Sequence, residues 1–178
     1  MIILDTNVLS ALMRETADTQ VIEWLDKQAR TSIWTNSVTV LEIRFGLQVL
    51  PPGKRRSALV KAFETVLADK ISGRITSFDE VAAQHSAELM ARRHSEGRRV
   101  DLRDTIIAGT ALACNASLAT RNIAHFGDLS IPVVILESRR GRRNSFRDAM
   151  IAPAGRIKKV WLRGQDLNLR PLGYEFNA

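Results

Sequence analysis

The sequence has little of what several common classes of protein require. Its single cysteine, Cys114, excludes an intramolecular disulfide and a cysteine-rich metal cluster. No apolar run approaches the ~18 residues of a membrane-spanning helix, and no basic segment precedes the first apolar run as it would in a signal peptide. We therefore expect a soluble, cytoplasmic, single-domain protein in which Cys114 is a buried and inert thiol.

Histidines are also few. His85 and His94 fall on one polar helical segment and His125 in a loop, and no serine or cysteine has the setting of a nucleophile elbow. A Ser–His–Asp type of catalytic triad is therefore not indicated. We expect the three histidines to lie on the surface.

The net charge of +7 comes from one end of the chain. Residues 139–178 hold ten basic and three acidic residues, whereas residues 1–138 are neutral. The high pI therefore describes the tail and gives no case for nucleic-acid binding by the rest. Two local basic clusters are open to two interpretations, as nucleic-acid contacts or as solvated helix ends: Lys54-Arg55-Arg56, and Arg92-Arg93 with Arg98-Arg99.

Short apolar segments alternate with segments of helical periodicity. Strands are predicted at 2–4, 33–35, 74–76, 117–120 and 133–136, the third of them at an edge of the sheet. Helices are predicted at 19–29, 37–50, 54–68, 80–97 and 101–115. Strands that alternate with helices indicate an α/β fold with a parallel sheet covered on both faces.

Local signals mark the starts of two helices. Ser37 is predicted to cap the first of them, and Ser77 with Glu80, three residues later, forms the pattern of a capping box. Apolar residues at helical spacing in the first of these helices predict its buried face: Val38, Leu41, Phe45 and Val49.

Three acidic residues lie beside apolar segments. Asp5 follows the first strand, Glu42 lies next to an apolar helical position, and Asp104 precedes a run of apolar residues in the first turn of a helix. A carboxylate in such a place is costly unless it is paired or bound to a metal ion. If the three converge, they form a hard-cation site that suits Mg²⁺ or Mn²⁺, can activate water and stabilises in-line phosphoryl displacement.

Each acid also has a purely structural interpretation. Asp5 would begin a turn or cap the following helix, and Asp104 would be a favourable acid in a first turn that Asp101 caps. Glu42 would be a solvated glutamate in mid-helix. Taken singly, the residues leave both interpretations open.

Four segments in a fixed order carry a family resemblance. They are Ile3-Leu4-Asp5-Thr6-Asn7, Leu41-Glu42-Ile43-Arg44-Phe45-Gly46, Asp104-Thr105-Ile106-Ile107-Ala108, and Leu118-Ala119-Thr120-Arg121-Asn122 with Phe126. In their order and spacing the chain resembles PIN-domain ribonucleases over residues 1–138, and among them the toxins of bacterial VapBC toxin–antitoxin pairs in the subgroup related to FitB. The resemblance implies a PIN-like three-layer α/β domain with a mainly parallel five-stranded sheet flanked by helices.

The resemblance also implies an activity and partners. The expected activity is hydrolysis of RNA phosphodiester bonds by a toxin nuclease that depends on Mg²⁺ or Mn²⁺. The expected partners are the RNA substrate, a second copy of the chain, and a cognate VapB-type antitoxin that blocks the cleft and represses the operon through its own DNA-binding part. No membrane association is expected.

Asp5, Glu42 and Asp104 match the family's principal acids. The resemblance implies that Asp5 and Asp104 are direct metal ligands, with Glu42 as a further ligand or as the group that orients water. Asn122 stands at a fourth site that is often aspartate, and His125 replaces another frequent acid, so this edge is less acidic than usual. The resemblance also implies that Thr6, Asn7 and Thr120 hold the acids or bound waters in place. Arg44 and Arg121 would contact either phosphates or structural carboxylates.

Two other functions stay open. The departures at 122 and 125 would suit a catalytically weakened PIN domain that acts mainly as an antitoxin-binding partner. A haloacid-dehalogenase-type phosphatase also places an aspartate after its first strand, but it needs a second aspartate two residues later, where this chain has Asn7. Metal-dependent RNA cleavage separates these alternatives.

Residues 139–178 differ in character from the rest. They begin with Arg-Arg-Gly-Arg-Arg, lose periodicity, and end in a stretch that resembles a peptide found on unrelated bacterial proteins, as read-through into a neighbouring structural-RNA gene would produce. We expect a basic, disordered C-terminal extension. The functional alternative is a basic arm that adds nonspecific RNA affinity.

Overall fold

Five parallel strands form the sheet at the centre of the fold, in a computed structural model that describes residues 1–14, 18–98 and 100–136. The strands lie in the order β3-β2-β1-β4-β5, and each neighbouring pair is parallel. Both the parallel sheet and the edge position of the third strand are confirmed. The strands are β1 (Ile2–Leu4), β2 (Ile33–Asn36), β3 (Ile75–Thr76), β4 (Ser117–Thr120) and β5 (Val133–Ile135).

Seven α-helices flank this sheet within the described residues. A 3₁₀ turn at Arg30–Ser32 and a π-helical turn at Leu67–Ile71 complete the helical structure. None of the described helices has both the length and the apolar character needed to cross a membrane. The helices are α1 (Thr6–Ala11), α2 (Thr19–Asp26), α3 (Ser37–Val49), α4 (Lys54–Val66), α5 (Glu80–Ser95), α6 (Leu102–Ala113) and α7 (Ile123–Phe126).

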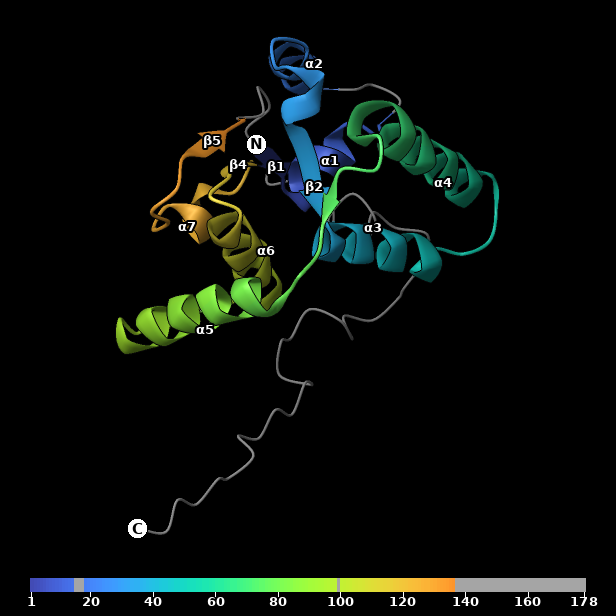
Figure 1. Cartoon of the computed structure of the whole chain (residues 1–178). Helices are drawn as coiled ribbons and strands as arrows, with labels where there is room; N and C mark the ends of the chain where they lie inside the picture. Colours follow the sequence, from blue (N-terminus) through green and yellow to red (C-terminus); the bar gives the residue numbers. More distant parts are fainter. Residues whose placement is uncertain (15–17, 99, 137–178) are drawn as a thin grey trace.

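The two faces of the sheet bury two separate apolar cores. Successive residues of a strand point to opposite faces, and in β1 Ile3 packs with residues of α5, α6 and α7, whereas Leu4 packs with residues of α1, α2, α3 and α4. Figure 1 shows α5 and α6 together on one side of the strands and α4 on the other. The predicted three-layer α/β architecture is therefore confirmed.

Helices α5 and α6 pack very closely at one glycine. A Cβ atom added to Gly109 of α6 would lie 2.0 Å from Ser86 Oγ and 2.7 Å from the carbonyl oxygen of Ala82, both on α5. Only a residue without a side chain allows this approach. The contact fixes the position of α6, which carries Asp104 in its first turn.

The buried face of α3 differs from the prediction. Leu41 and Val49 have exposed fractions of 63% and 60%, and Phe45 is also exposed, so of the predicted stripe only Val38 is buried. The core side of the helix is formed instead by Val38, Thr39, Ile43 and Leu47. The helix has two apolar stripes, and periodicity alone does not show which one meets the sheet.

Two predicted caps and one predicted burial are also wrong. The side chain of Asn36, and not Ser37, caps α3 by accepting from Thr39 N, because the helix begins at Ser37 itself. Asp79, and not Ser77, caps α5 by accepting from Ala82 N at 2.9 Å. Cys114 is exposed, because the apolar run ends with α6 and leaves the thiol at the helix end.

The predicted extension at 139–178 lies outside the described residues. The division into a domain over 1–138 and a basic tail therefore stays a prediction.

Candidate functional site

Asp5 occupies the junction between β1 and α1. Because all five strands are parallel, their carboxyl ends meet at one edge of the sheet, where ligands of open α/β sheets bind. Asp5 also caps α1, its Oδ1 accepting from the backbone N–H of Thr6 at 2.6 Å. The structural and functional interpretations of Asp5 are thus compatible, since one carboxylate oxygen serves the cap.

The second oxygen of Asp5 is held from the neighbouring strand. Thr120 Oγ1, at the end of β4, donates to Asp5 Oδ2 at 2.7 Å, and Asn7 Nδ2 lies 3.4 Å from the same oxygen. The side chain is therefore fixed by donors from two elements. Thr120 and Asn7 support the acid, as the resemblance implied.

Burial and nearby negative charge act together on Asp5. The residue is 2% exposed. Its pKa is raised to about 7, chiefly by desolvation and also by the carboxylates of Asp104 and Glu42, against the lowering effect of the hydrogen bonds from Thr120 and Thr6. Asp104 and Glu42 are therefore close enough to Asp5 to disfavour its ionised form, which a positive charge beside it would stabilise.

Glu42 reaches the site from α3. Its Oε2 accepts a hydrogen bond from Thr6 Oγ1 at 2.6 Å, and its Oε1 lies 3.5 Å from Arg103 Nη1. The Glu42 side chain is only 15% exposed, so the interpretation as a solvated mid-helix glutamate is wrong. Thr6 connects Glu42 to the cap of α1 and thus to Asp5.

Asp104 approaches from the first turn of α6. Asp101 caps this helix, its Oδ1 accepting from the backbone N–H groups of Arg103 and Asp104 at 3.0 and 3.3 Å. The carboxylate of Asp104 contacts Nδ1 of His125 on α7. Asp104 is thus both an acid in a capped first turn and a member of the cluster.

Asn122 is less closely tied to the acids. Its backbone N–H donates to Thr120 Oγ1 at 3.0 Å, which links it to Asp5 through the threonine hydroxyl. Its side chain makes no capping bond to α7. The structure therefore brings together Asp5, Glu42 and Asp104, and places Asn122 beside them through its backbone.

The two arginines considered as phosphate contacts bind structural carboxylates. Arg121 forms an ion pair with Asp18 at 2.8 Å. Arg44 lies 3.0 Å from Glu64 and 5.5 Å from the centre of the Phe63 ring. For both arginines the geometry therefore favours contacts with structural carboxylates over contacts with phosphates.

A buried arginine network lies behind Asp104. Arg93 is 3% exposed, and its guanidinium donates to both oxygens of Asp128, at 2.8 and 2.7 Å, and to the carbonyl of His125 at 2.7 Å. Arg92 and Arg98 also pair with Asp128. The cluster that suggested nucleic-acid contacts or a solvated helix end is therefore largely a structural ion-pair network.

Asp128 was not among the residues singled out from the sequence. The guanidinium of Arg93 holds the pKa of its carboxyl well below the ordinary value. The two residues are 35 positions apart, Arg93 on α5 and Asp128 in the turn after α7. No pattern in the sequence pairs them.

The acidic cluster suits a divalent cation that keeps water ligands. In the part of the chain that the structure describes, no three Asp, Glu, His or Cys side chains are placed so that together they could hold a metal ion. Mg²⁺ is usually held by one or two carboxylates and retains several waters, so it does not need three. Carboxylate oxygens that repel one another around Asp5 are the donors that such an ion prefers.

Several known proteins are similar to this chain in sequence and in structure. The VapC ribonuclease Y4jK of Sinorhizobium fredii is 35% identical over 134 residues, which are 75% of this chain and 96% of that protein. The FitAcB crystal structure from Neisseria gonorrhoeae has a TM-score of 0.68 at 31% identity and covers 75% of this chain and 96% of that chain. VapBC-5 of Mycobacterium tuberculosis, a member of the VapBC family of toxin–antitoxin systems, has a TM-score of 0.56 at 26% identity. The match covers 75% of this chain and 96% of that chain.

The family assignment rests on a match over most of the described chain. The model of the PIN domain matches residues 2–130, a range that contains all four sequence segments of the predicted resemblance. The chain belongs to the PIN-domain family.

Proposed function

We propose that this protein is the toxin of a type II toxin–antitoxin pair and acts as a metal-dependent ribonuclease. The observation that carries the proposal is the buried carboxylate of Asp5, which Asp104 and Glu42 approach closely enough to raise its pKa. Among the described residues, the ion pairs of the site involve Glu42 and Asp104 and not Asp5. A divalent cation would compensate this charge.

Asp5 and Asp104 are proposed as the direct metal ligands. Asp5 is fixed by the Thr6 N–H and the Thr120 hydroxyl, and Asp104 is fixed by the capped first turn of α6. Such bonds orient carboxylates before an ion arrives, which favours binding. When bound, Mg²⁺ or Mn²⁺ would supply positive charge to stabilise the negative charge that develops on the phosphate.

Glu42 is proposed to position the attacking water or to act as a further ligand. Its Oε2 accepts from Thr6, and its Oε1 faces Arg103 at 3.5 Å, so the carboxylate is held at the edge of the cluster. Hydrolysis of an RNA phosphodiester requires water in line with the bond that breaks, and an ionised carboxylate can orient that water and accept its proton. Asn122 is proposed to contact bound water at the fourth site.

The proposed partners follow from the relatives. VapBC-5 belongs to a toxin–antitoxin system, and Y4jK is a VapC ribonuclease. We infer a cognate VapB-type antitoxin that covers the acidic cluster, an RNA substrate, and assembly with a second copy of the chain. We also propose a cytoplasmic location, where both the RNA substrate and the antitoxin would be available.

An RNA cleavage assay tests the proposal. The full chain, freed from its antitoxin, is incubated with structured RNAs in Mg²⁺ or Mn²⁺, and with excess chelator. We expect cleavage that the chelator abolishes and that Asp5→Asn reduces at least ~10²-fold. Asp26→Asn is the matched control, because this aspartate is exposed on α2 and pairs only loosely with Lys70, at 3.7 Å.

The same assay addresses the two alternatives. A weakened PIN domain that only binds an antitoxin would bind its partner and leave RNA intact with either ion. Two observations count against a haloacid-dehalogenase-type phosphatase. The chain matches the PIN-domain model over residues 2–130, and Asn7 stands where that class of phosphatase needs its second aspartate. Chelator-resistant cleavage by both wild type and Asp5→Asn would contradict the proposal.

A further inference from the structure

Arg103 brings a positive charge to the edge of the acidic cluster. It lies in the first turn of α6, directly before Asp104, and its side chain is 34% exposed. Its Nη1 lies 3.5 Å from Oε1 of Glu42, and its Nε lies 4.0 Å from Oδ1 of Asp101. The guanidinium therefore stands beside the carboxylates and is still reachable from solvent.

Two other arginines near the cluster are turned toward structural carboxylates. Arg121 lies 2.8 Å from Asp18, and only 12% of its side chain is exposed. Arg93 lies 2.7 Å from Asp128, and only 4% of its side chain is exposed. Of these three arginines, Arg103 is the one whose guanidinium both faces an acid of the cluster and is open to a ligand from solvent.

RNA would meet negative charge at this cluster. Each phosphodiester of RNA carries a negative charge, and the carboxylates of Asp5, Glu42 and Asp104 lie close enough to act on one another. A phosphate that approaches them is repelled unless positive charge lies beside it. A guanidinium has five N–H donors in a planar fork, so Arg103 can donate to a phosphate oxygen and keep a contact with Glu42.

We propose that Arg103 binds a backbone phosphate of RNA at the acidic cluster and thereby places the bond to be cleaved beside Asp104 and Glu42. This inference rests on the proposed function, because it names a residue that holds the substrate of the same ribonuclease. The alternative is that Arg103 only balances the charge of Glu42. In that case Arg103 would affect RNA through Glu42 alone.

RNA binding without cleavage tests this proposal. The full chain, freed from its antitoxin, is titrated in excess chelator into a fluorescein-labelled single-stranded RNA of mixed sequence, and anisotropy gives Kd at several salt concentrations. We expect Arg103→Ala to raise Kd by ~10-fold and to reduce the slope of log Kd against log salt by about 0.7, the value of one phosphate contact on a single strand. Arg103→Lys should lie between wild type and Arg103→Ala, because lysine keeps the charge but loses the planar fork.

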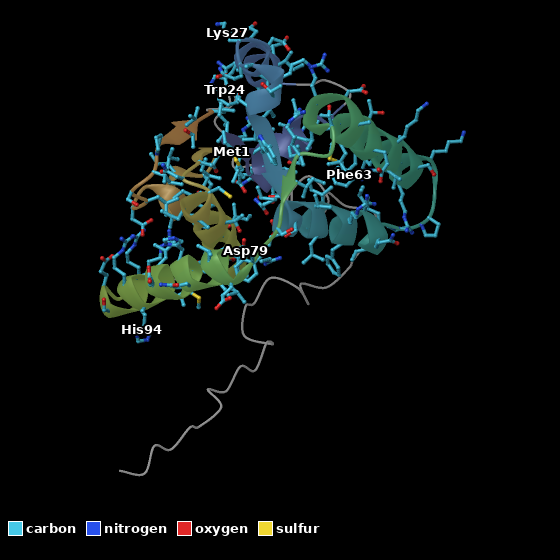
Figure 2. All side chains as sticks on the ribbon, in the orientation of Figure 1. Met1, Trp24, Lys27, Phe63, Asp79 and His94 are labelled. Atoms are coloured by element: carbon cyan, nitrogen blue, oxygen red, sulfur yellow. The ribbon has the colours of Figure 1, made fainter. Side chains whose placement is uncertain are left out.

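Arg30→Ala is the matched control for the loss of one positive charge. Arg30 is exposed in the 3₁₀ turn before β2, where it donates to the carbonyl of Asp69. Because the strands are parallel, this turn lies at the amino edge of the sheet, opposite the edge that carries Asp5. Figure 2 shows Lys27, which lies shortly before this turn in the chain, at the top of the view and away from α5 and α6. Arg30→Ala should bind RNA as wild type does.

Glu42→Gln separates the two roles of Arg103. If Arg103 contacts phosphate, the loss of the neighbouring carboxylate removes repulsion of RNA, so Glu42→Gln should lower Kd. Arg103→Ala should then still raise Kd by ~10-fold in the Glu42→Gln background. If Arg103 only balances Glu42, its replacement changes nothing in that background, and this result would overturn the proposal.

Cleavage kinetics distinguish this inference from the proposed function, with circular dichroism to show that each variant is folded. If wild type cleaves RNA and Arg103→Ala has the same Kd and KM, Arg103 does not hold the substrate, and the ribonuclease stands. If wild type neither binds nor cleaves RNA, the proposed function fails and this inference fails with it. A higher Kd and KM for Arg103→Ala, with Arg30→Ala unchanged, supports the inference.

Discussion

Replacing Asp5 by asparagine is expected to stabilise the metal-free protein at neutral and alkaline pH. Asp5 is buried, and its pKa is about 7, above the ordinary value of 3.8. Between these two values the folded chain keeps a proton at Asp5 that the unfolded chain has released. The free energy of unfolding of wild type therefore falls as the pH rises from about 4 to about 7.

The size of this effect follows from the shift in pKa. The shift is about three units at about 1.4 kcal/mol each, so ionisation of Asp5 costs the fold up to about 4 kcal/mol. Asparagine removes this cost, in which the bonds from Thr120 and Thr6 to the carboxylate are already included, but it offers one acceptor oxygen to these two donors and so loses one neutral hydrogen bond, worth about 1 kcal/mol. We expect Asp5→Asn to be more stable than wild type by about 2–3 kcal/mol at pH 8, and within about 1 kcal/mol of it at pH 4.

Urea unfolding of the full chain, followed by circular dichroism, measures this difference. The experiment is done with chelator at pH 4 and pH 8, with Asp26→Asn as the control for a surface carboxylate on α2. Added Mg²⁺ should then stabilise wild type at pH 8, by about 2.7 kcal/mol at a hundred times its Kd, and leave Asp5→Asn unchanged.

One result would refute this reasoning. If Asp5→Asn were less stable than wild type at pH 8 by the same amount as at pH 4, the carboxylate would be favourably solvated or paired in the folded state. The mutual repulsion of the three acids, and with it the reason for a cation, would then be absent.

Substitutions at other contacts are expected to change the stability of the fold in specific ways. Asp128→Asn should lower the free energy of unfolding at neutral pH by about 3–5 kcal/mol, because it removes the carboxylate that pairs with the buried Arg93. The difference from wild type should become smaller in acid, as the pH approaches the lowered pKa of Asp128. Urea unfolding at several pH values measures both effects. Thr120→Val removes the hydroxyl that donates to Asp5 and lowers its pKa, so the pKa of Asp5 should rise further. The fall in the free energy of unfolding with pH should then extend to higher pH than in wild type. An unchanged pH profile would count against this hydrogen bond. Ile43→Ala should lower the free energy of unfolding, measured in urea, by about 2–5 kcal/mol, because Ile43 is buried, and Leu41→Ala should lower it by less than about 0.5 kcal/mol, because Leu41 is exposed. The reverse order would mean that the face predicted from periodicity is the buried one.

The sheet was predictable because its signal is local. Each strand is a short apolar run between polar residues, and the alternation of strands with helices leaves few arrangements other than a parallel sheet covered on both faces. The observed strands agree with the predicted ones to within a residue or two. Side-chain alternation within β1, with Ile3 on one face and Leu4 on the other, follows from strand geometry alone.

The orientation of α3 was not predictable in the same way. Its sequence offers one apolar stripe through Leu41 and Val49 and another through Ile43 and Leu47. Periodicity gives the spacing of a face but not which face meets the core. In the structure the second stripe packs with residues of β1, α1, α2 and α4, and these contacts come from the tertiary structure.

The acids were predictable because they lie in four sequence segments that occur in a fixed order. Singly, Asp5 looked equally like a cap, and the structure shows that it is one. The ion pair between Arg93 and Asp128 joins residues 35 positions apart, and the contact of His125 with Asp104 spans 21. Neither pair belongs to a periodic pattern, so both required the tertiary structure.

We propose that Asp5 and its neighbouring acids hold a divalent ion that the protein uses to cleave RNA. The most direct measurement is RNA cleavage by the purified full chain, with Mg²⁺ or Mn²⁺ and with chelator, for wild type, Asp5→Asn and Asp26→Asn. We predict cleavage by wild type and Asp26→Asn that depends on the ion, and loss of cleavage in Asp5→Asn. Equal cleavage by all three proteins in the presence of chelator would contradict the account.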